Sequence, residues 1–227
     1  MLRLFLPEIC IHCGNACDKT KAKPMTQYLC EVCLRQLELF ESPPQEALIP
    51  KSLFFKEIPF KIEIGSRFSF QNGGIIQSLI HHVKYNEMPK LGKILGQVSA
   101  EKNYDISKEY DYIVPIPLHR TRYSERGYNQ SEMLAAGIGA VPVAKRNWLK
   151  RIRQTPSQTG LSLEQREENV RGAFELSKKG IEALKGKRIL LIDDVMTTGA
   201  TLASAASSLT IAKPKKVDIF ALAAVVD

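Results

Sequence analysis

Hydrophobic and polar positions follow two different periods along this chain, and each period predicts a type of secondary structure. Residues 60–70 (FKIEIGSRFSF) alternate apolar and polar side chains, which is typical of a strand with one covered face. Residues 72–101 instead repeat apolar side chains three and four positions apart. That spacing indicates two helices, and Pro89 marks the break between them.

The rest of the chain alternates apolar runs with helical segments. The apolar runs are residues 111–118, 141–145, 188–193 and 216–225; the helical segments are residues 129–139, a short helix from Ser162, and residues 199–211. Near-continuous apolar strands are typical of parallel sheets that are buried on both faces. We therefore predict an α/β fold in which a mostly parallel sheet is flanked by helices.

The size of the chain limits how many such units it can hold. With 227 residues and 44% hydrophobic side chains, it can form one full-sized domain with a small appendage. The apolar run 219–226 is far shorter than the roughly 20 residues that a membrane span needs, and residues 1–10 do not resemble a signal peptide. These features predict a cytoplasmic protein without a transmembrane segment.

All five cysteines lie in the first 33 residues, which identifies the appendage. Four of them have the spacing C-x2-C-x16-C-x2-C, namely Cys10, Cys13, Cys30 and Cys33. Two such turns can close a tetrahedral shell of four thiolates, so we predict a structural zinc site, with disulfides or free core thiols as the alternatives. Cys17 and His12 are not needed for that shell. We place a zinc-ribbon module at residues 1–36, a linker at 37–59 and the main domain at 60–227.

The net charge of +8 favours anionic partners, and it is concentrated in one stretch. Residues 115–155 contain eight Lys or Arg and two acids: Arg120, Arg122, Arg126, Lys145, Arg146, Lys150, Arg151 and Arg153, with Glu125 and Glu132. Tyr123, Tyr128 and Trp148 are interleaved with them, which is the composition of a surface for single-stranded DNA. A solvated basic face without a specific ligand is the alternative interpretation.

Two adjacent acids, Asp193 and Asp194, follow the apolar run 188–192, and the segment VMTTGAT comes directly after them. In open α/β sheets, ligands bind at the carboxyl ends of the strands. A glycine-containing loop that leads into a helix directs backbone N–H groups at an anion, and the carboxylates next to it can accept hydrogen bonds from hydroxyl groups. This combination fits a ribose 5-phosphate, whereas simple capping of the next helix by the acids is the alternative.

A nucleotide triphosphatase is excluded by the absence of the matching phosphate-binding loop. This chain has two Gly-Lys pairs, at 92–93 and 186–187, and they are followed by Ile94 and Arg188 where that loop has Ser or Thr.

The segment ILLIDDVMTTGAT resembles the fingerprint of type I phosphoribosyltransferases, which binds phosphoribosyl pyrophosphate (PRPP). Together with the four cysteines, LIHHVKY (79–85), residues 114–135 and residues 151–174, it resembles the ComF/GntX family, which includes the competence protein ComFC. The resemblance covers nearly the whole chain. It implies a type I phosphoribosyltransferase fold with an N-terminal zinc finger.

The resemblance also implies roles for individual residues. Asp193 and Asp194 would hold the ribose hydroxyls as the catalytic acids, and the 5-phosphate would be held by the loop residues Thr197, Thr198, Gly199, Ala200 and Thr201. The departing pyrophosphate needs Mg²⁺ and basic side chains, for which the candidates are Lys84, Arg120, Arg122 and Arg126. The polar segment 153–166 fits a mobile flap over the sugar, with an ordinary surface loop as the alternative.

The function implied by the resemblance is that of a PRPP-binding competence protein. It would handle incoming single-stranded DNA in the cytoplasm during natural transformation, alone or at the inner membrane through DNA-uptake partners such as a helicase. Two alternatives stay open, a nucleobase salvage transferase and a non-catalytic protein regulated by PRPP. The acceptor of any phosphoribosyl group is not readable from the sequence, so whether the chain is an enzyme stays open at this point.

Overall fold

The computed structural model describes residues 9–17, 24–39, 52, 55–56, 58–100, 106–155 and 162–225. A four-stranded sheet in the order β1-β6-β5-β2 forms its centre, and all neighbouring strands are parallel. These strands are β1 (Ile64–Ser69), β2 (Tyr112–Pro115), β5 (Arg188–Met196) and β6 (Lys216–Ala224). The predicted α/β fold with a parallel sheet is therefore confirmed.

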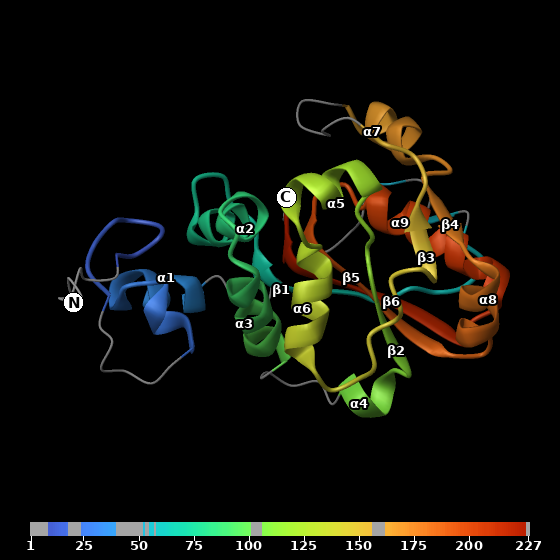
Figure 1. Cartoon of the computed structure of the whole chain (residues 1–227), viewed down its shortest axis with the longest axis horizontal. Helices are drawn as coiled ribbons and strands as arrows, with labels where there is room; N and C mark the ends of the chain where they lie inside the picture. Colours follow the sequence, from blue (N-terminus) through green and yellow to red (C-terminus); the bar gives the residue numbers. More distant parts are fainter. Residues whose placement is uncertain are drawn as a thin grey trace.

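Helices cover both faces of this sheet (Figure 1). The helices are α1 (Glu31–Leu39), α2 (Ile75–Tyr85), α3 (Pro89–Ala100), α4 (Ile106–Glu109), α5 (Arg120–Arg126), α6 (Gln130–Ile138), α7 (Leu163–Val170), α8 (Lys178–Leu184) and α9 (Ala200–Leu209), with 3-10 turns at η1 (Pro24–Gln27) and η4 (Thr210–Ala212). In β5, Ile189 and Leu191 pack into the apolar cluster of α7, α8 and α9. Leu190 and Ile192 pack into the cluster of α2, α3 and α6, as strand alternation requires.

Close contact between α3 and α6 depends on two glycines. A Cβ atom at Gly96 would lie 2.1 Å from the carbonyl oxygen of Leu134, and one at Gly137 would lie 1.9 Å from that of Lys93. Both distances are shorter than any real Cβ contact, so only glycine allows the two helix backbones to approach this closely. The crossing fixes α6 on the sheet, and α6 carries a side chain of the candidate site.

Two parts of the fold differ from the sequence predictions. Residues 141–145 form only an isolated bridge between Val143 and Ile113, because Pro142 has no N–H group to extend the ladder. A two-stranded antiparallel sheet that was not predicted joins β3 (Leu149–Arg151) to β4 (Phe174–Leu176). The two strands flank the predicted flap at 153–166, and α7, the helix predicted from Ser162, begins in that segment and continues beyond it (Figure 1).

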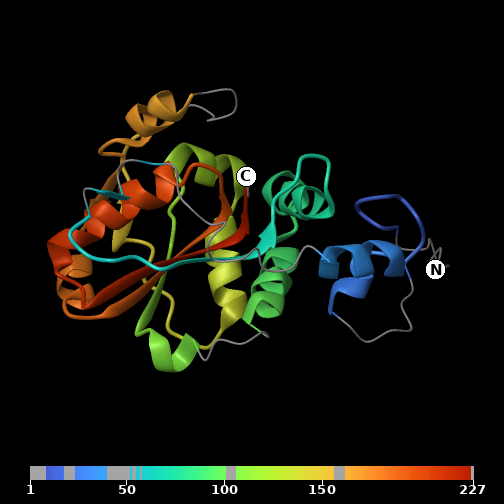
Figure 2. The ribbon, with the colours of Figure 1, turned by 180° about the vertical axis from the view of Figure 1, so that it is seen from behind.

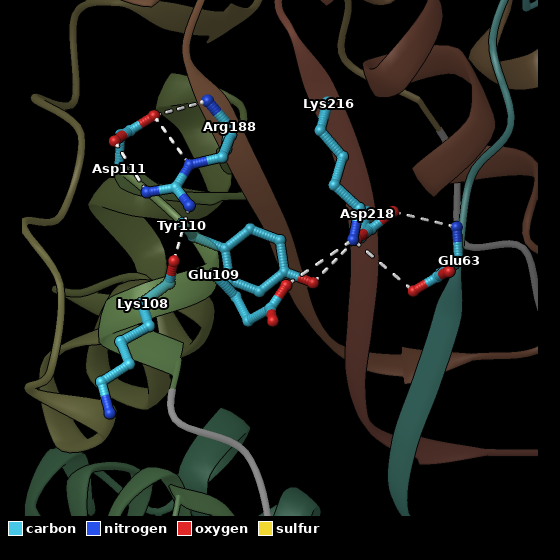
Figure 3. Close-up of polar contacts among 8 residues, drawn as sticks. All are labelled: Glu63, Lys108, Glu109, Tyr110, Asp111, Arg188, Lys216 and Asp218. Atoms are coloured by element: carbon cyan, nitrogen blue, oxygen red, sulfur yellow. Dashed lines mark hydrogen bonds and ion pairs between the residues drawn. The ribbon is translucent and has the colours of Figure 1, made fainter.

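A polar network holds the amino-terminal ends of the strands (Figure 3). The buried Asp218 accepts hydrogen bonds from the Glu63 backbone N–H at 3.0 Å and the Tyr110 hydroxyl at 2.7 Å, and it pairs with Lys216 at 2.7 Å. Next to it, Asp111 accepts from the backbone N–H of Arg188 at 2.8 Å and pairs with its guanidinium at 3.2 Å. Carboxylates with this many partners, the buried Asp218 above all, keep strands in register, so the network braces the sheet end opposite the strands' carboxyl ends.

The N-terminal module lies at one end of the molecule beside α2 and α3, far from α8 (Figures 1 and 2). Among its described residues, Cys10, Met25 and Leu29 belong to the same apolar cluster as the buried side of α2. His12 Nδ1 also hydrogen-bonds with Ser78 Oγ of α2 at 2.9 Å. The predicted linker, residues 37–59, lies largely outside the described residues, and the predicted domain boundaries stay predictions.

Candidate functional site

The acid pair lies where β5 extends beyond its neighbour β2. Pro115, the last residue of β2, is opposite Ile192, and the Ile116 N–H donates to the Ile192 carbonyl at 2.9 Å. The sequence predicted that this strand ends at Asp193. Instead, β5 continues to Met196, because β6 pairs with it as far as Ala224. The two acids therefore project from a strand that is fixed on one side by β6 and open on the other side, where β2 has ended.

Asp193 is held in a buried position with a defined orientation. It is 8% exposed, and its Oδ1 accepts hydrogen bonds from Ser131 Oγ of α6 and from the backbone N–H of Asp194, both at 2.9 Å. Burial and the adjacent Asp194 carboxylate raise the pKa of Asp193 to about 7. A proton therefore lies on Asp193 under mildly acidic conditions, and its carboxylate is an available acceptor above neutrality.

Asp194 is also buried, and its partner comes from the other side of the site. Its Oδ2 lies 2.7 Å from Nζ of Lys84, near the carboxyl end of α2. A buried carboxylate is strongly disfavoured without a compensating charge, so this ion pair makes two neighbouring acids tolerable inside the protein. The structure therefore brings Lys84 to the adjacent acids Asp193 and Asp194, which follow it by more than 100 positions in the sequence.

The loop after β5 presents backbone N–H groups at the start of α9. Gly199 has φ +81°, a left-handed conformation that favours glycine, and α9 begins at the next residue, Ala200. The Thr198 carbonyl accepts a hydrogen bond from the Ser52 N–H at 3.0 Å, and Thr197 Oγ1 accepts one from Arg166 of α7 at 3.1 Å. α7 thus contacts the loop from the flap segment, which is the position that a flap over the site requires.

The three candidate arginines lie on α5, which follows β2. His119 caps this helix by accepting from the Thr121 N–H at 3.4 Å. Arg122 donates to the Thr155 carbonyl at 3.1 Å, and Arg126 donates to Gln130 Oε1. Arg120 is exposed and has no recorded contact within the described part of the chain.

The stretch that the sequence suggested as a DNA surface contains both exposed and internally packed side chains. Trp148 lies in the core against Tyr112, with ring centroids 5.2 Å apart, so it cannot stack on a base. Arg146 forms a two-bond pair with Glu132, at 2.7 and 2.8 Å, and covers the Tyr123 ring at 4.2 Å. Lys145 and Lys150 are exposed. The stacking part of the earlier interpretation is therefore wrong for Trp148.

The four predicted cysteine ligands converge on one point. The sulfur atoms of Cys10, Cys13, Cys30 and Cys33 all lie within 4.8 Å of one another, and no disulfide joins them. Tetrahedral zinc with bonds of about 2.3 Å would place its sulfur ligands about 3.8 Å apart, so the cluster fits that ion. Burial raises the pKa of Cys10, but backbone N–H groups outweigh that effect and lower it to about 7, whereas burial and the neighbouring sulfur atoms raise the pKa of Cys33.

Sequence reasoning missed three contributors to the candidate phosphate site. They are Ser131, which donates to Asp193; Arg166, which donates to Thr197; and Ser52, which donates to Thr198 and also to Glu167. Each of them contacts a residue that is far away in the sequence. Serine and arginine are also common on protein surfaces. No spacing or periodicity marks such residues, so only the fold could reveal them.

Comparisons with known proteins agree with this geometry. The family described as "Phosphoribosyl transferase domain" matches residues 142–226, which include the acid pair and the loop. Competence protein F of Haemophilus influenzae is 29% identical over 85% of this chain and 74% of its own length. Competence protein ComFC of Bacillus subtilis is 26% identical over 89% and 78%, and DNA utilization protein YhgH of Escherichia coli is 28% identical over 59% and 60%.

The parallel sheet, the domain match and the four-cysteine cluster define a phosphoribosyltransferase-domain protein with an N-terminal four-cysteine cluster. More particularly, the chain is a ComF/ComFC-like protein, homologous to competence protein F and to the DNA utilization protein. Within the described residues, none of the helices has both the length and the apolar character that crossing a membrane requires.

Proposed function

We propose that this protein binds PRPP with Mg²⁺ at the loop between β5 and α9. In this proposal Asp193 and Asp194 accept hydrogen bonds from the ribose 2′- and 3′-hydroxyls, and the backbone N–H groups of residues 197–201 hold the 5-phosphate. The observation that carries the proposal is the position of the acid pair, which is buried beside the open end of β2, with Asp194 five residues before a left-handed glycine that opens a helix.

The charges of the site support this assignment. With both acids ionised, the pair carries one negative charge more than Lys84 compensates, and ribose hydroxyls can donate to the carboxylate oxygens while Lys84 stays beside Asp194. Lys84, at the edge of the acid pair, and Arg120, at the start of α5, are the cations that we assign to the pyrophosphate. Oxygen donors of the acid pair and of pyrophosphate are the ligands that Mg²⁺ prefers, and when bound it supplies positive charge for pyrophosphate departure.

Zinc is the ion that we assign to the four-cysteine cluster. Four thiolates at tetrahedral spacing fill the coordination shell and leave no position for a substrate, so this zinc would have a structural role.

We further propose that the PRPP site serves the handling of single-stranded DNA in natural transformation. The names of the relatives, competence protein F and DNA utilization protein, support this part of the proposal. The setting would be the cytoplasm, where DNA-uptake proteins such as a helicase are the expected partners. A salvage transferase would need neither the cysteine module nor a DNA surface.

Isothermal calorimetry of PRPP with Mg²⁺ tests the binding site directly. We expect the double variant Asp193→Asn, Asp194→Asn to lose at least ten-fold in affinity, because charge-assisted hydrogen bonds contribute about 1.5 to 3 kcal/mol each. Asp111→Asn, at the opposite end of the sheet, is the matched control and should bind like the wild type. Unchanged affinity in the double variant would return the acid pair to a helix-capping role.

Pyrophosphate release distinguishes the possible fates of bound PRPP. The assay compares free nucleobases with single-stranded DNA as acceptors, in the presence of Mg²⁺. Release with a free base alone would favour salvage, and PRPP binding without release under any condition would favour a regulatory ligand.

A further inference from the structure

Tyr85, the last residue of α2, is an exposed aromatic ring beside the acid pair. Its side chain is 66% exposed, and it directly follows Lys84, whose Nζ lies 2.7 Å from Asp194. Single exposed apolar residues need no explanation, but this ring does not stand alone. Two other flat groups contact it, the imidazole of His81 and the guanidinium of Arg126.

The contacts around the ring give it a defined position. The His81 and Tyr85 ring centroids are 4.9 Å apart, and the Arg126 guanidinium carbon lies 5.4 Å from the Tyr85 centroid. The end of α2 is also held on both sides, because Lys84 pairs with Asp194 and the Tyr128 hydroxyl donates to the Val83 carbonyl. A ligand that stacks on Tyr85 would therefore meet a ring that is already placed, which lowers the entropic cost of binding.

The chemistry of these groups limits what can bind. The ring is flanked by a guanidinium and by imidazole rather than by aliphatic side chains, so the complementary ligand is flat and belongs to an anionic molecule. A free base would need an enclosing pocket, whereas this ring is open to solvent. A base in a duplex is already stacked, whereas an unpaired base on a polyanionic strand offers both the flat face and the charge.

We propose that the Tyr85 ring, flanked by His81 and Arg126, is a stacking site for an unpaired base of single-stranded DNA beside the PRPP site. The inference rests on the proposed function, and it names the surface through which DNA reaches that site. Within the basic stretch 115–155, Trp148 is buried and Arg146 is paired with Glu132, so neither is placed to stack on a base as Tyr85 is.

The test measures fluorescence anisotropy of a labelled oligothymidine with Tyr85→Ala and Tyr85→Phe. From the stacking of one base on an aromatic ring, Tyr85→Ala should weaken binding by about five- to hundred-fold, while Tyr85→Phe should stay within about two-fold. The salt dependence should be unchanged, because neither substitution alters a charge. Tyr123→Ala is the matched control, since Tyr123 also lies under an arginine, and it should bind like the wild type.

Several results would overturn the proposal. Wild-type affinity in Tyr85→Ala, an equal loss in Tyr85→Phe, or an equal loss in Tyr123→Ala would each remove the ring of Tyr85 as the stacking group. Competition by free thymidine at the same concentration as the oligonucleotide would show that the occupant is a free base.

PRPP calorimetry on the same variants separates this inference from the proposed function. We expect Tyr85→Ala to keep its PRPP affinity within two-fold and its melting temperature within about 2 °C of the wild type. If the wild-type protein binds PRPP but no oligonucleotide, the DNA part of the proposed function fails and this inference fails with it. If the wild type binds the oligonucleotide and Tyr85→Ala binds it equally well, only this inference fails.

Discussion

The substitution Asp193→Asn should remove the pH dependence that Asp193 imposes on stability. Asp193 has a folded-state pKa of about 7, against an ordinary value of 3.8. Between these values the folded protein binds a proton that the unfolded chain has released. The free energy of unfolding therefore receives the full contribution of this group below about pH 4 and loses it as the pH rises through 7.

The size of the effect follows from that pKa rise. A rise of about three pH units, at about 1.4 kcal/mol each, gives about 4 kcal/mol in total, of which about 3 kcal/mol falls between pH 5 and 8. Lys84 opposes the rise in the pKa of Asp193, and its effect is already contained in this value. Asparagine cannot ionise, yet its Oδ1 can still accept from Ser131 and from the Asp194 N–H. From pH 5 to pH 8 the variant should gain about 1 to 3 kcal/mol relative to the wild type.

Urea unfolding at pH 5, 6, 7 and 8 measures this difference. Other groups titrate in both proteins, so the quantity to compare is the difference in unfolding free energy between variant and wild type at each pH. Asp111→Asn is the control, because Arg188 lowers the pKa of Asp111 below this range and its difference should not vary with pH. A difference for Asp193→Asn that is flat from pH 5 to 8 would refute the buried, proton-sharing arrangement.

Three other predictions follow from the packing and from the cysteine cluster. The wild-type protein should carry about one zinc ion per chain by elemental analysis, and the double variant Cys30→Ser, Cys33→Ser should carry none; retained zinc would contradict the assigned ligands. Gly96→Ala should lower the urea-unfolding free energy by about 1 to 3 kcal/mol, whereas Gly65→Ala, whose Cβ meets only a ring atom at 3.7 Å, should be close to neutral. His12→Ala should weaken PRPP binding in calorimetry by a few-fold without loss of zinc, and unchanged affinity would show that the module does not position α2.

Local sequence patterns predicted the strand, loop and helix of the candidate phosphate site and the cysteine cluster. An apolar strand, a glycine at the turn and a small-residue helix are encoded within residues 188–211, so β5, the loop and α9 were readable together. The cysteine spacing likewise predicted a cluster whose sulfur atoms converge. In both cases the residues that determine the structure are near neighbours in the sequence, and the pattern itself has a physical cause.

Pairings between distant segments were not readable in this way. The sequence placed Arg146 in a basic stretch without showing its partner, yet Glu132, fourteen positions before it, accepts hydrogen bonds from two of its three nitrogens. β3 and β4 have only three residues each, which is too short for a periodic signal, and their pairing exists because the flap between them folds back. Trp148 looked like a surface aromatic because charged residues surround it in the sequence, but the fold places it under Tyr112.

Helix α2 contacts the cysteine module through Ser78 and the acid pair through Lys84, so one rigid rod carries both contacts. Each residue of an α-helix turns by about 100° and rises by about 1.5 Å. Inserting or deleting a single residue between these positions would turn one contact away while the other stayed in place. The spacing of six residues between Ser78 and Lys84 therefore fixes the relative direction of the two contacts around the helix axis. We expect relatives that keep both contacts to vary the sequence of this helix freely but to keep this spacing.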